Sequence, residues 1–227
     1  MSGRFLAIGD VHGYSKALDA LLEAVQPKEE DTLIFLGDYI DRGPDSSGVI
    51  ERIIQWQQRV PVVALLGNHE EMMVASRLHA GQYREWMSCG GVPTLESYLP
   101  LTGEPTLSSV PESHWTFFET CKPWYEIDTH FFVHANAEPQ LPLDEQPDYT
   151  LRWKSFRDVQ PHVSGKIMVC GHTAQRTGMP LNVGYAVCID TWIYGAGWLT
   201  CLDVSTNGYW QSQPSGEVRT GKLIQPQ

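Results

Sequence analysis

The sequence has no long apolar run, no excess of positive charge and no paired cysteine motif. A membrane-spanning helix needs about 20 consecutive apolar residues, and no stretch of the sequence approaches that length. The formal net charge of −11 excludes a non-specific grip on nucleic acid, because neutralising phosphates requires a basic face. The segment Met1–Gly9 is too short for a signal peptide. We therefore expect a cytoplasmic protein that uses neither a membrane nor a nucleic acid.

The five cysteines are odd in number and widely spaced, and no two of them form a Cys-x-x-Cys pair. This pattern argues against a disulfide framework and against a structural zinc knot, and it fits a reducing compartment. Cys170, Cys188 and Cys201 lie in apolar runs, which favours buried thiols that pack as small hydrophobic side chains.

The remaining composition is that of an ordinary globular protein. Hydrophobic residues make up 42% of the chain and charged residues 19%. The 227 residues are enough to bury a sizeable core, and one compact domain over residues 1–227 is the simplest expectation.

Three short blocks that begin with glycine stand out against this background. They are Gly9-Asp-Val-His-Gly13, Gly37-Asp-Tyr-Ile-Asp-Arg-Gly43 and Gly67-Asn-His-Glu70, and each follows an apolar run typical of a buried strand. A carboxylate at a strand end binds a hard or borderline cation, and a nearby arginine holds an anionic group beside that cation. Three such blocks in series indicate a metal site that acts on an anion.

Helical patterns separate the three strands. Apolar residues recur at helical spacing over residues 17–25, with Ser15 as candidate cap, and over residues 49–54, with Asp45 or Ser46 as candidate cap. Alternating strands and helices predict a parallel sheet with right-handed crossovers. Ligand sites of such sheets lie beyond the carboxyl ends of the strands. The polar residues expected to converge there are Asp10, His12, Asp38, Asp41, Arg42, Asn68 and His69.

The rest of the chain divides into a helical insert and a mostly β half. Residues 71–123 predict short helical pieces over one edge of the site, with a break at Cys89-Gly-Gly-Val-Pro93. Apolar or alternating runs between residues 125 and 212 predict strands, two of which lead to His134 and His172. We expect residues 217–227 to form a loose tail.

The three blocks, His134 and Gly171-His172 together resemble the phosphoprotein phosphatase family of metallophosphoesterases. The segments 89–98 and 188–200 are similar to its bacterial members, which include protein phosphatases and symmetrical diadenosine tetraphosphatases. The resemblance covers about residues 4–204. It implies an α/β protein with the calcineurin-like metallophosphoesterase fold, in which two packed mixed β-sheets are flanked by helices.

The resemblance also implies two divalent metal ions. The expected ligands are Asp10, His12 and Asp38 for one ion, and Asp38, Asn68, His134 and His172 for the other. Asp38 would bridge the two ions. Oxygen and nitrogen donors without a thiolate suit manganese, with iron and zinc as alternatives, better than calcium. Two such ions, roughly 3.5–4 Å apart, share a hydroxide nucleophile and clamp the phosphate oxygens.

Catalytic roles follow from the same resemblance. His69 would be the general acid for the leaving alkoxide, and Asp41 would set its tautomer and keep it protonated. Arg42 would bind the phosphate in bidentate fashion. A second phosphate-binding arginine is expected at Arg152, with Arg157 as the alternative, because the Leu-Trp pair that usually precedes it is rearranged here.

Two positions depart from the family pattern. Asn136 stands where the family usually has glycine, two residues after the metal-binding histidine His134, and we expect its side chain to narrow the rim of the site. Trp192 stands where glycine commonly follows Asp-Thr, so the loop there is expected to have a different shape.

The predicted function is hydrolysis of phosphomonoesters, as a serine/threonine or dual-specificity phosphatase acting on a phosphorylated protein, a peptide or a small phosphoester. One alternative is a symmetrical dinucleoside tetraphosphate pyrophosphohydrolase. The acidic insert should repel a tetraphosphate, although Tyr83, Trp86 and Trp115 in that insert offer surfaces for stacking adenine. Another alternative is an inactive binding module, which predicts a lost ligand or a lost His69, and the sequence retains all of them. Nothing in the sequence predicts an oligomeric state.

Overall fold

The computed structural model describes residues 3–99 and 105–224, and its first part has the predicted alternation of strands and helices. The elements are β1 (Phe5–Ile8), α1 (Ser15–Val25), β2 (Thr32–Phe35), α2 (Ser46–Trp56) and β3 (Val62–Ala64). Strand β2 pairs in parallel with both β1 and β3. Asp45 caps α2 by accepting the backbone N–H of Gly48 at 3.1 Å. Ser15 does not cap α1, because its hydroxyl donates to the carboxylate of Asp45.

The first sheet has six strands in the order β11-β10-β9-β1-β2-β3. Strands from the end of the chain complete it: β9 (Leu199–Asp203), β10 (Gly208–Ser212) and β11 (Val218–Lys222). Strand β9 runs antiparallel to β1, so the sheet is mixed.

The expectation of a loose tail after residue 217 is wrong for the described residues 218–222. Strand β11 pairs antiparallel with β10 along its whole length, and Arg219 donates to Gln211 Oε1 at 2.8 Å. Leu223, which follows the strand, is buried. The strand lies at the sheet edge, and its residues alternate between exposed and half-buried. It therefore lacks the apolar alternation by which a strand is recognised in sequence.

The second sheet has five strands in the order β4-β5-β6-β8-β7. Their bounds are β4 (Trp124–Glu126), β5 (His130–Val133), β6 (Ile167–Cys170), β7 (Leu181–Asn182) and β8 (Ala186–Cys188). Strands β5, β6 and β8 are parallel, whereas β4 and β7 pair antiparallel with their neighbours. The prediction of two mixed sheets flanked by helices is confirmed.

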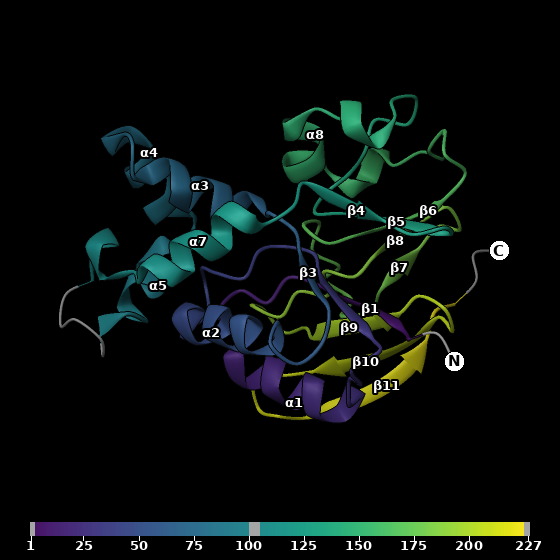
Figure 1. The fold of residues 1–227 in the computed structure, drawn as a ribbon, viewed down its shortest axis with the longest axis horizontal. Helices are drawn as coiled ribbons and strands as arrows, with labels where there is room; N and C mark the ends of the chain where they lie inside the picture. Colours follow the sequence, from purple (N-terminus) through teal and green to yellow (C-terminus); the bar gives the residue numbers. More distant parts are fainter. Residues whose placement is uncertain (1–2, 100–104, 225–227) are drawn as a thin grey trace.

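Three apolar layers hold these elements together (Figure 1). Between the sheets, Ala7 and Ile34 of the first pack in one cluster with Phe132 and Val169 of the second. Helices α1 and α2 cover the other face of the first sheet. The outer face of the second sheet is covered by η3 (Leu143–Glu145), α8 (Asp148–Trp153) and η4 (Phe156–Asp158). The strand ends of both sheets are thereby fixed relative to each other.

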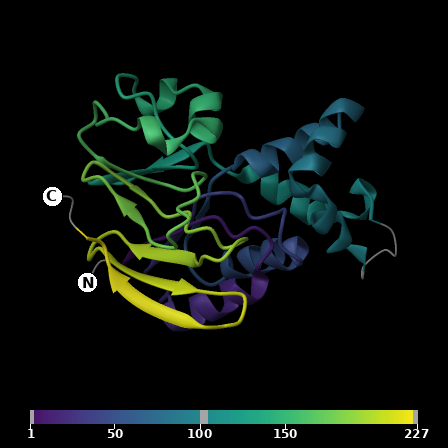
Figure 2. The same ribbon diagram turned by 180° about the vertical axis from the view of Figure 1, so that it is seen from behind.

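The segment between β3 and β4 is helical in its described residues and stands beside the sheets (Figures 1 and 2). Its elements are α3 (Asn68–Ser76), α4 (Ala80–Trp86), the π-helical turn η1 (Met87–Gly91), α5 (Val92–Glu96), η2 (Leu107–Ser109) and α7 (Glu112–Thr120). Gly90 has φ of 119°, which breaks the helix at the predicted place. Residues 100–104 of the expected insert lie outside the described residues.

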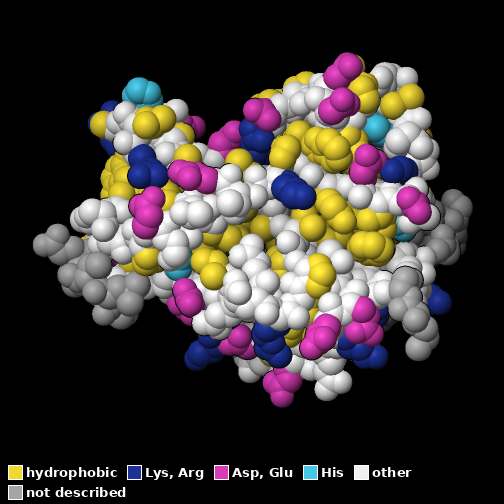
Figure 3. Space-filling model, viewed as in Figure 1, with side chains coloured by type: hydrophobic (Ala, Val, Ile, Leu, Met, Phe, Trp, Pro, Cys, Tyr) yellow, Lys and Arg dark blue, Asp and Glu magenta, His cyan; other side chains and the backbone are white. Residues whose placement is uncertain are grey.

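No helix in the described residues is both long enough and apolar enough to cross a membrane. On the face drawn in Figure 3, acidic and basic side chains of the described residues are interspersed.

Candidate active site

The loops that follow β1, β2, β3, β5 and β6 meet at one place between the two sheets. Each contributes polar side chains directly after its strand: Asp10 and His12, Asp38 and Asp41, Asn68 and His69, His134, and His172. The loops approach so closely that glycine is required. A Cβ on Gly37 would lie 2.7 Å from Gly67 N, and a Cβ on Gly171 would lie 2.0 Å from Asp10 Oδ1. The glycines of the sequence blocks thus allow the polar side chains to converge.

Asp38 lies at the centre of this convergence. Its Oδ2 is 3.7 Å from His12 Nε2, and its Oδ1 is 3.4 Å from His134 Nε2. Two clusters of potential ligand atoms share it, one with His12 and His69 and the other with His134 and His172. Within each cluster the ligand atoms lie within 4.8 Å of one another. A shared carboxylate between two clusters is the arrangement that two neighbouring metal ions require.

The hydrogen bonds of the cluster that contains His134 and His172 indicate that a cation binds there. His134 Nδ1 donates to Leu36 O at 2.8 Å, and His172 Nε2 donates to Trp153 O at 3.1 Å. The remaining ring nitrogens, His134 Nε2 and His172 Nδ1, each lie 2.9 Å from Asn68 Oδ1. In neutral imidazoles all three atoms present lone pairs to one another. A bound cation converts this repulsion into coordination.

The electrostatics of the buried groups fit a cation equally well. Burial, with a contribution from the neighbouring His134, lowers the pKa of His172 to about 4, so its ring is neutral and able to bind metal. Burial and the nearby carboxylates of Asp190 and Asp38 raise the pKa of Asp10 well above its ordinary value. Asp190 Oδ2 is buried with no hydrogen-bond partner among the described residues. A divalent cation would offset the cost of burying these carboxylates together.

His69 and Asp41 form a tight pair beside Asp38. His69 Nδ1 donates to Asp41 Oδ2 at 2.6 Å, while His69 Nε2 lies 3.9 Å from Asp38 Oδ2. Burial alone would lower the pKa of His69, but the carboxylates of Asp38 and Asp41 raise it above its usual value. The protonated imidazole is therefore favoured, with one N–H facing the centre of the site.

The helical insert holds Asp41 in place. Trp86 Nε1 donates to Asp41 Oδ2 at 3.0 Å, and Thr94 Oγ1 donates to Asp41 Oδ1 at 2.7 Å. The neighbouring Arg42 donates its backbone N–H to Gly90 O at 3.2 Å. The sequence did not predict this role for Trp86, which was considered as a surface for stacking adenine. The Gly-Gly-x-Pro-Thr motif that contains Thr94 was the available signal.

Glu70 is another contributor that the sequence did not reveal. Its carboxylate is fully buried and accepts the backbone N–H groups of Asp38 at 2.9 Å, Tyr39 at 2.8 Å and Gly67 at 3.1 Å. One side chain thus ties the loop after β2 to the loop after β3. Its place next to His69 in the third block was the only hint.

Arg42 lies at the mouth of the site. Its guanidinium donates to His12 Nε2 at 2.7 Å. A terminal nitrogen of Arg42 also lies 3.0 Å from His69 Nε2, which can accept from it only while that imidazole is neutral. The guanidinium also lies over the ring of Tyr194, 4.0 Å from its centroid. These contacts place its donors at the cluster formed by His12, Asp38 and His69.

The two other predicted arginines have different surroundings. Arg152 is buried, and its Nε and terminal nitrogens donate to Glu71 at 2.9 Å and to Asp148 at 3.1 Å. Two carboxylates therefore hold its guanidinium. The alternative, Arg157, lines a cavity beside His172.

The two departures from the family pattern have structural explanations. Asn136 is buried and its amide donates to Ser155 O at 2.8 Å, so it supports a neighbouring loop and the expected narrowing of the rim is wrong. Trp192 has φ of 65°, a left-handed conformation that glycine adopts readily. Left-handed backbone is concentrated in this site. The other non-glycine site residues with positive φ are His12, Asp38, Asp41, Arg42 and His172.

Two mixed sheets with carboxylate, imidazole and amide donors at their strand ends define a metal-dependent phosphoesterase. The model of one family, described as calcineurin-like phosphoesterase, matches residues 3–176, and the chain belongs to that family. The family predicted from the sequence is therefore confirmed.

Named relatives include enzymes with different substrates in their names. The chain is 29% identical over 157 residues to serine/threonine-protein phosphatase 1 of Salmonella typhimurium, covering 67% of this chain and 63% of that protein. It is 39% identical over 160 residues to the symmetrical bis(5'-nucleosyl)-tetraphosphatase of Ralstonia nicotianae, covering 66% and 51%. The chain thus spans less than two thirds of the length of either relative.

Solved structures share the fold. A putative diadenosine tetraphosphatase superposes with a TM-score of 0.65 at 22% identity, covering 99% of this chain and 95% of that one. A cold-active protein tyrosine phosphatase mutant superposes with a TM-score of 0.69 at 17% identity, covering 97% and 80%.

Proposed function

We propose that this protein hydrolyses phosphomonoesters at a site for two metal ions, with phosphorylated serine, threonine or tyrosine side chains as substrates. The main support for this proposal is the position of Asp38. Two clusters of potential ligand atoms share its carboxylate, which lies directly beside the His69–Asp41 pair. A shared carboxylate supplies the metal site, and the adjacent pair supplies a proton donor.

The residues would divide between the two ions as the family resemblance implies. Asp10, His12 and Asp38 would hold one ion, with manganese the first candidate and iron or zinc the next. The second ion would be bound by Asp38, Asn68, His134 and His172. When bound, the ions would polarise the phosphate oxygens and lower the pKa of the attacking water.

His69 would donate the proton that the leaving alkoxide needs. Its Nδ1 is occupied by Asp41, so only Nε2 can face the substrate. Asp41 favours the charged imidazole and keeps the ring from turning. General acids of this kind contribute about 10²–10⁴-fold to the rate.

Arg42 would orient the phosphate at the mouth of the site. Its planar guanidinium offers several donors, and stacking on Tyr194 limits its rotation. Donors that are already in place when the phosphoryl group flattens stabilise the transition state.

The insert supports a side-chain phosphomonoester over a dinucleotide. Two aromatics that offered stacking surfaces for adenine are unavailable: Trp86 is fully buried, and Trp115 is buried with Arg77 4.3 Å over its ring. The test is kcat/KM of manganese-loaded protein for phosphopeptides and for diadenosine tetraphosphate, at one metal concentration and one ionic strength. We expect the phosphopeptides to be preferred. A tenfold advantage for the dinucleotide would contradict the proposed substrate.

Trp86 provides a test of the His69–Asp41 pair that leaves both residues intact. Trp86→Phe keeps an aromatic ring in the core but removes the N–H that Asp41 accepts. We expect kcat to fall about tenfold, the usual weight of one hydrogen bond to a charged group, while KM stays unchanged. The loss should be larger for a phosphoserine peptide than for p-nitrophenyl phosphate, because the alkoxide depends more on His69.

Trp115→Phe is the matched control, because this indole lies in the same insert and no side chain of the site accepts its N–H. Equal losses in the two variants, or the same loss on both substrates, would reduce Trp86 to a packing residue.

A further inference from the structure

A cavity of about 650 Å³ opens beside His172. Its volume lies in the range of small-molecule sites. Its lining comes from η4 and the residue before it, from the loop after β6, from β7 and from the loop before β9. The residues are Ser155, Phe156, Arg157, His172, Thr173, Ala174, Gln175, Arg176, Leu181 and Tyr194. None of them belongs to the insert, so no acidic side chain of the insert lines this cavity.

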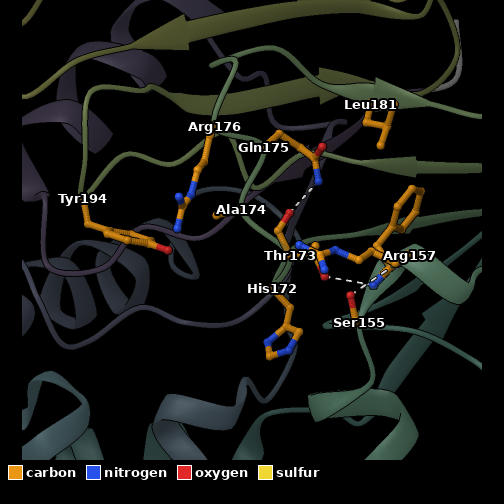
Figure 4. Close-up of a pocket in the computed structure, with 10 residues that line it drawn as sticks. Ser155, Arg157, His172, Thr173, Ala174, Gln175, Arg176, Leu181 and Tyr194 are labelled. Atoms are coloured by element: carbon orange, nitrogen blue, oxygen red, sulfur yellow. Dashed lines mark hydrogen bonds between the residues drawn. The ribbon is translucent and has the colours of Figure 1, made fainter.

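The charge of this lining is opposite to that of the chain. The sequence has 27 acidic and 16 basic residues, yet the cavity is lined by two arginines and no carboxylate. In the described part of the chain, the arginines that form ion pairs are Arg4, Arg52 and Arg152. Arg157 and Arg176 are therefore free to bind an anion. In Figure 4, the side chains of Arg176 and Tyr194 extend from two loops into one hollow.

The cavity continues directly from the metal-type cluster. His172 lines the cavity and also contributes Nδ1 to the cluster around Asn68. Tyr194 lines the cavity and stacks against Arg42. Arg176 lies 5.6 Å from the ring centroid of Trp192, which fixes it to the loop that carries Tyr194. A substrate with its scissile phosphate at the cluster would extend its next group into the cavity.

We infer that Arg157 and Arg176 form a subsite for a second phosphoryl group of the substrate. This inference rests on the proposed function, because it assumes that the first phosphoryl group is held at the cluster. A phosphorylated side chain carries about 1.5–2 negative charges at pH 7, so two guanidinium groups can neutralise it. Each phosphoryl of an oligophosphate chain is likewise anionic. The second group has two possible sources: a neighbouring phosphorylated side chain in a peptide, or the next phosphoryl of an oligophosphate.

The test compares substrates that differ by this second group. One pair is a phosphoserine peptide and the same peptide with a second phosphoserine close by. The other pair is adenosine monophosphate and adenosine diphosphate, in which the group next to the terminal phosphate is a sugar in the first compound and a phosphoryl in the second. We expect metal-loaded wild-type protein to have at least tenfold higher kcat/KM for the second member of one pair. The pair that shows the advantage identifies the source.

Arg157→Ala, Arg176→Ala and the double variant then test the residues. We expect the ratio of kcat/KM between the two members of the pair to fall about 10- to 100-fold in the double variant, because each arginine contributes charge-assisted hydrogen bonds to the second phosphoryl group. Arg59→Ala is the matched control. Arg59 lies over Trp56 at the end of α2. Its replacement by alanine removes the same charge as the other two substitutions. Measurements at 150 mM salt suppress effects of net charge alone, since the screening length is then about 8 Å.

Three outcomes would overturn the subsite: no advantage in either pair, an equal loss on both members of a pair, or the same change in Arg59→Ala. Calorimetric titration with pyrophosphate distinguishes failure of the subsite from failure of the proposed function, because binding needs no turnover. If every phosphoester resists hydrolysis, tighter binding of pyrophosphate than of phosphate, lost in the double variant, still supports the subsite. Equal binding of the two anions overturns it.

Discussion

Replacing His69 with asparagine is expected to lower kcat for a phosphoserine peptide by about 10²–10⁴-fold. The reason is geometric: His69 Nδ1 is bound to Asp41, and the other ring nitrogen faces the space beside Asp38. Asparagine retains a polar group of similar reach but offers no acidic proton. The deficit should shrink for p-nitrophenyl phosphate, whose leaving group needs little protonation.

The metal content of the His69→Asn variant distinguishes a proton donor from a metal ligand. Because its Nε2 also lies within reach of the His12–Asp38 cluster, loss of bound manganese in His69→Asn would indicate a ligand. We expect the manganese content to stay at the wild-type value. His79→Asn, a change of the same kind at an exposed histidine, serves as the control and should retain wild-type kinetics. An equal deficit on every leaving group would contradict the proton-donor role.

Removal of divalent metal is expected to abolish hydrolysis of p-nitrophenyl phosphate, and added manganese is expected to restore it. Without cations, the lone pairs of His134, His172 and Asn68 face one another and the buried carboxylates lack a counter-charge. The stripped protein should therefore also melt at a lower temperature, because a ligand that binds only the native state stabilises it.

Asp38→Asn should prevent this recovery, because the amide cannot bridge two cations with two anionic oxygens. Asp128→Asn, at an exposed aspartate, is the matched control and should recover fully. Full activity in thoroughly stripped protein, or full recovery in Asp38→Asn, would contradict a site for two metal ions.

The first half of the molecule was predictable because its signals are local. Each of the first three strands is an apolar run followed by a glycine and a polar residue, and parallel pairing brings those strand ends together. The positions of Asp10, Asp38 and Asn68 follow from that pattern. His134 and His172 required the family resemblance, because a single histidine after a strand carries little information.

What the sequence did not reveal depends on contacts between distant segments. Trp86 and Thr94 reach Asp41 across 45 and 53 residues, and Arg152 finds Glu71 across 81 residues. Hydrophobic periodicity is a local pattern, so it cannot predict hydrogen bonds between side chains that are far apart in the sequence. Strand β11 was missed for a different reason: it is an edge strand held by backbone pairing, so its side chains need no apolar pattern.

The left-handed residues of the site limit how this protein can be made more thermostable. Such strained positions cost of order 1–3 kcal/mol each, and His12, Asp38, Asp41, Arg42 and His172 all lie where function needs their side chains. Glycine there would relieve strain only by deleting the site. Gln26 and Asn207 are also left-handed, at φ of 48° and 59°, but lie at the end of α1 and in the turn before β10. Backbone stabilisation by glycine is therefore available at those two positions without loss of the catalytic side chains.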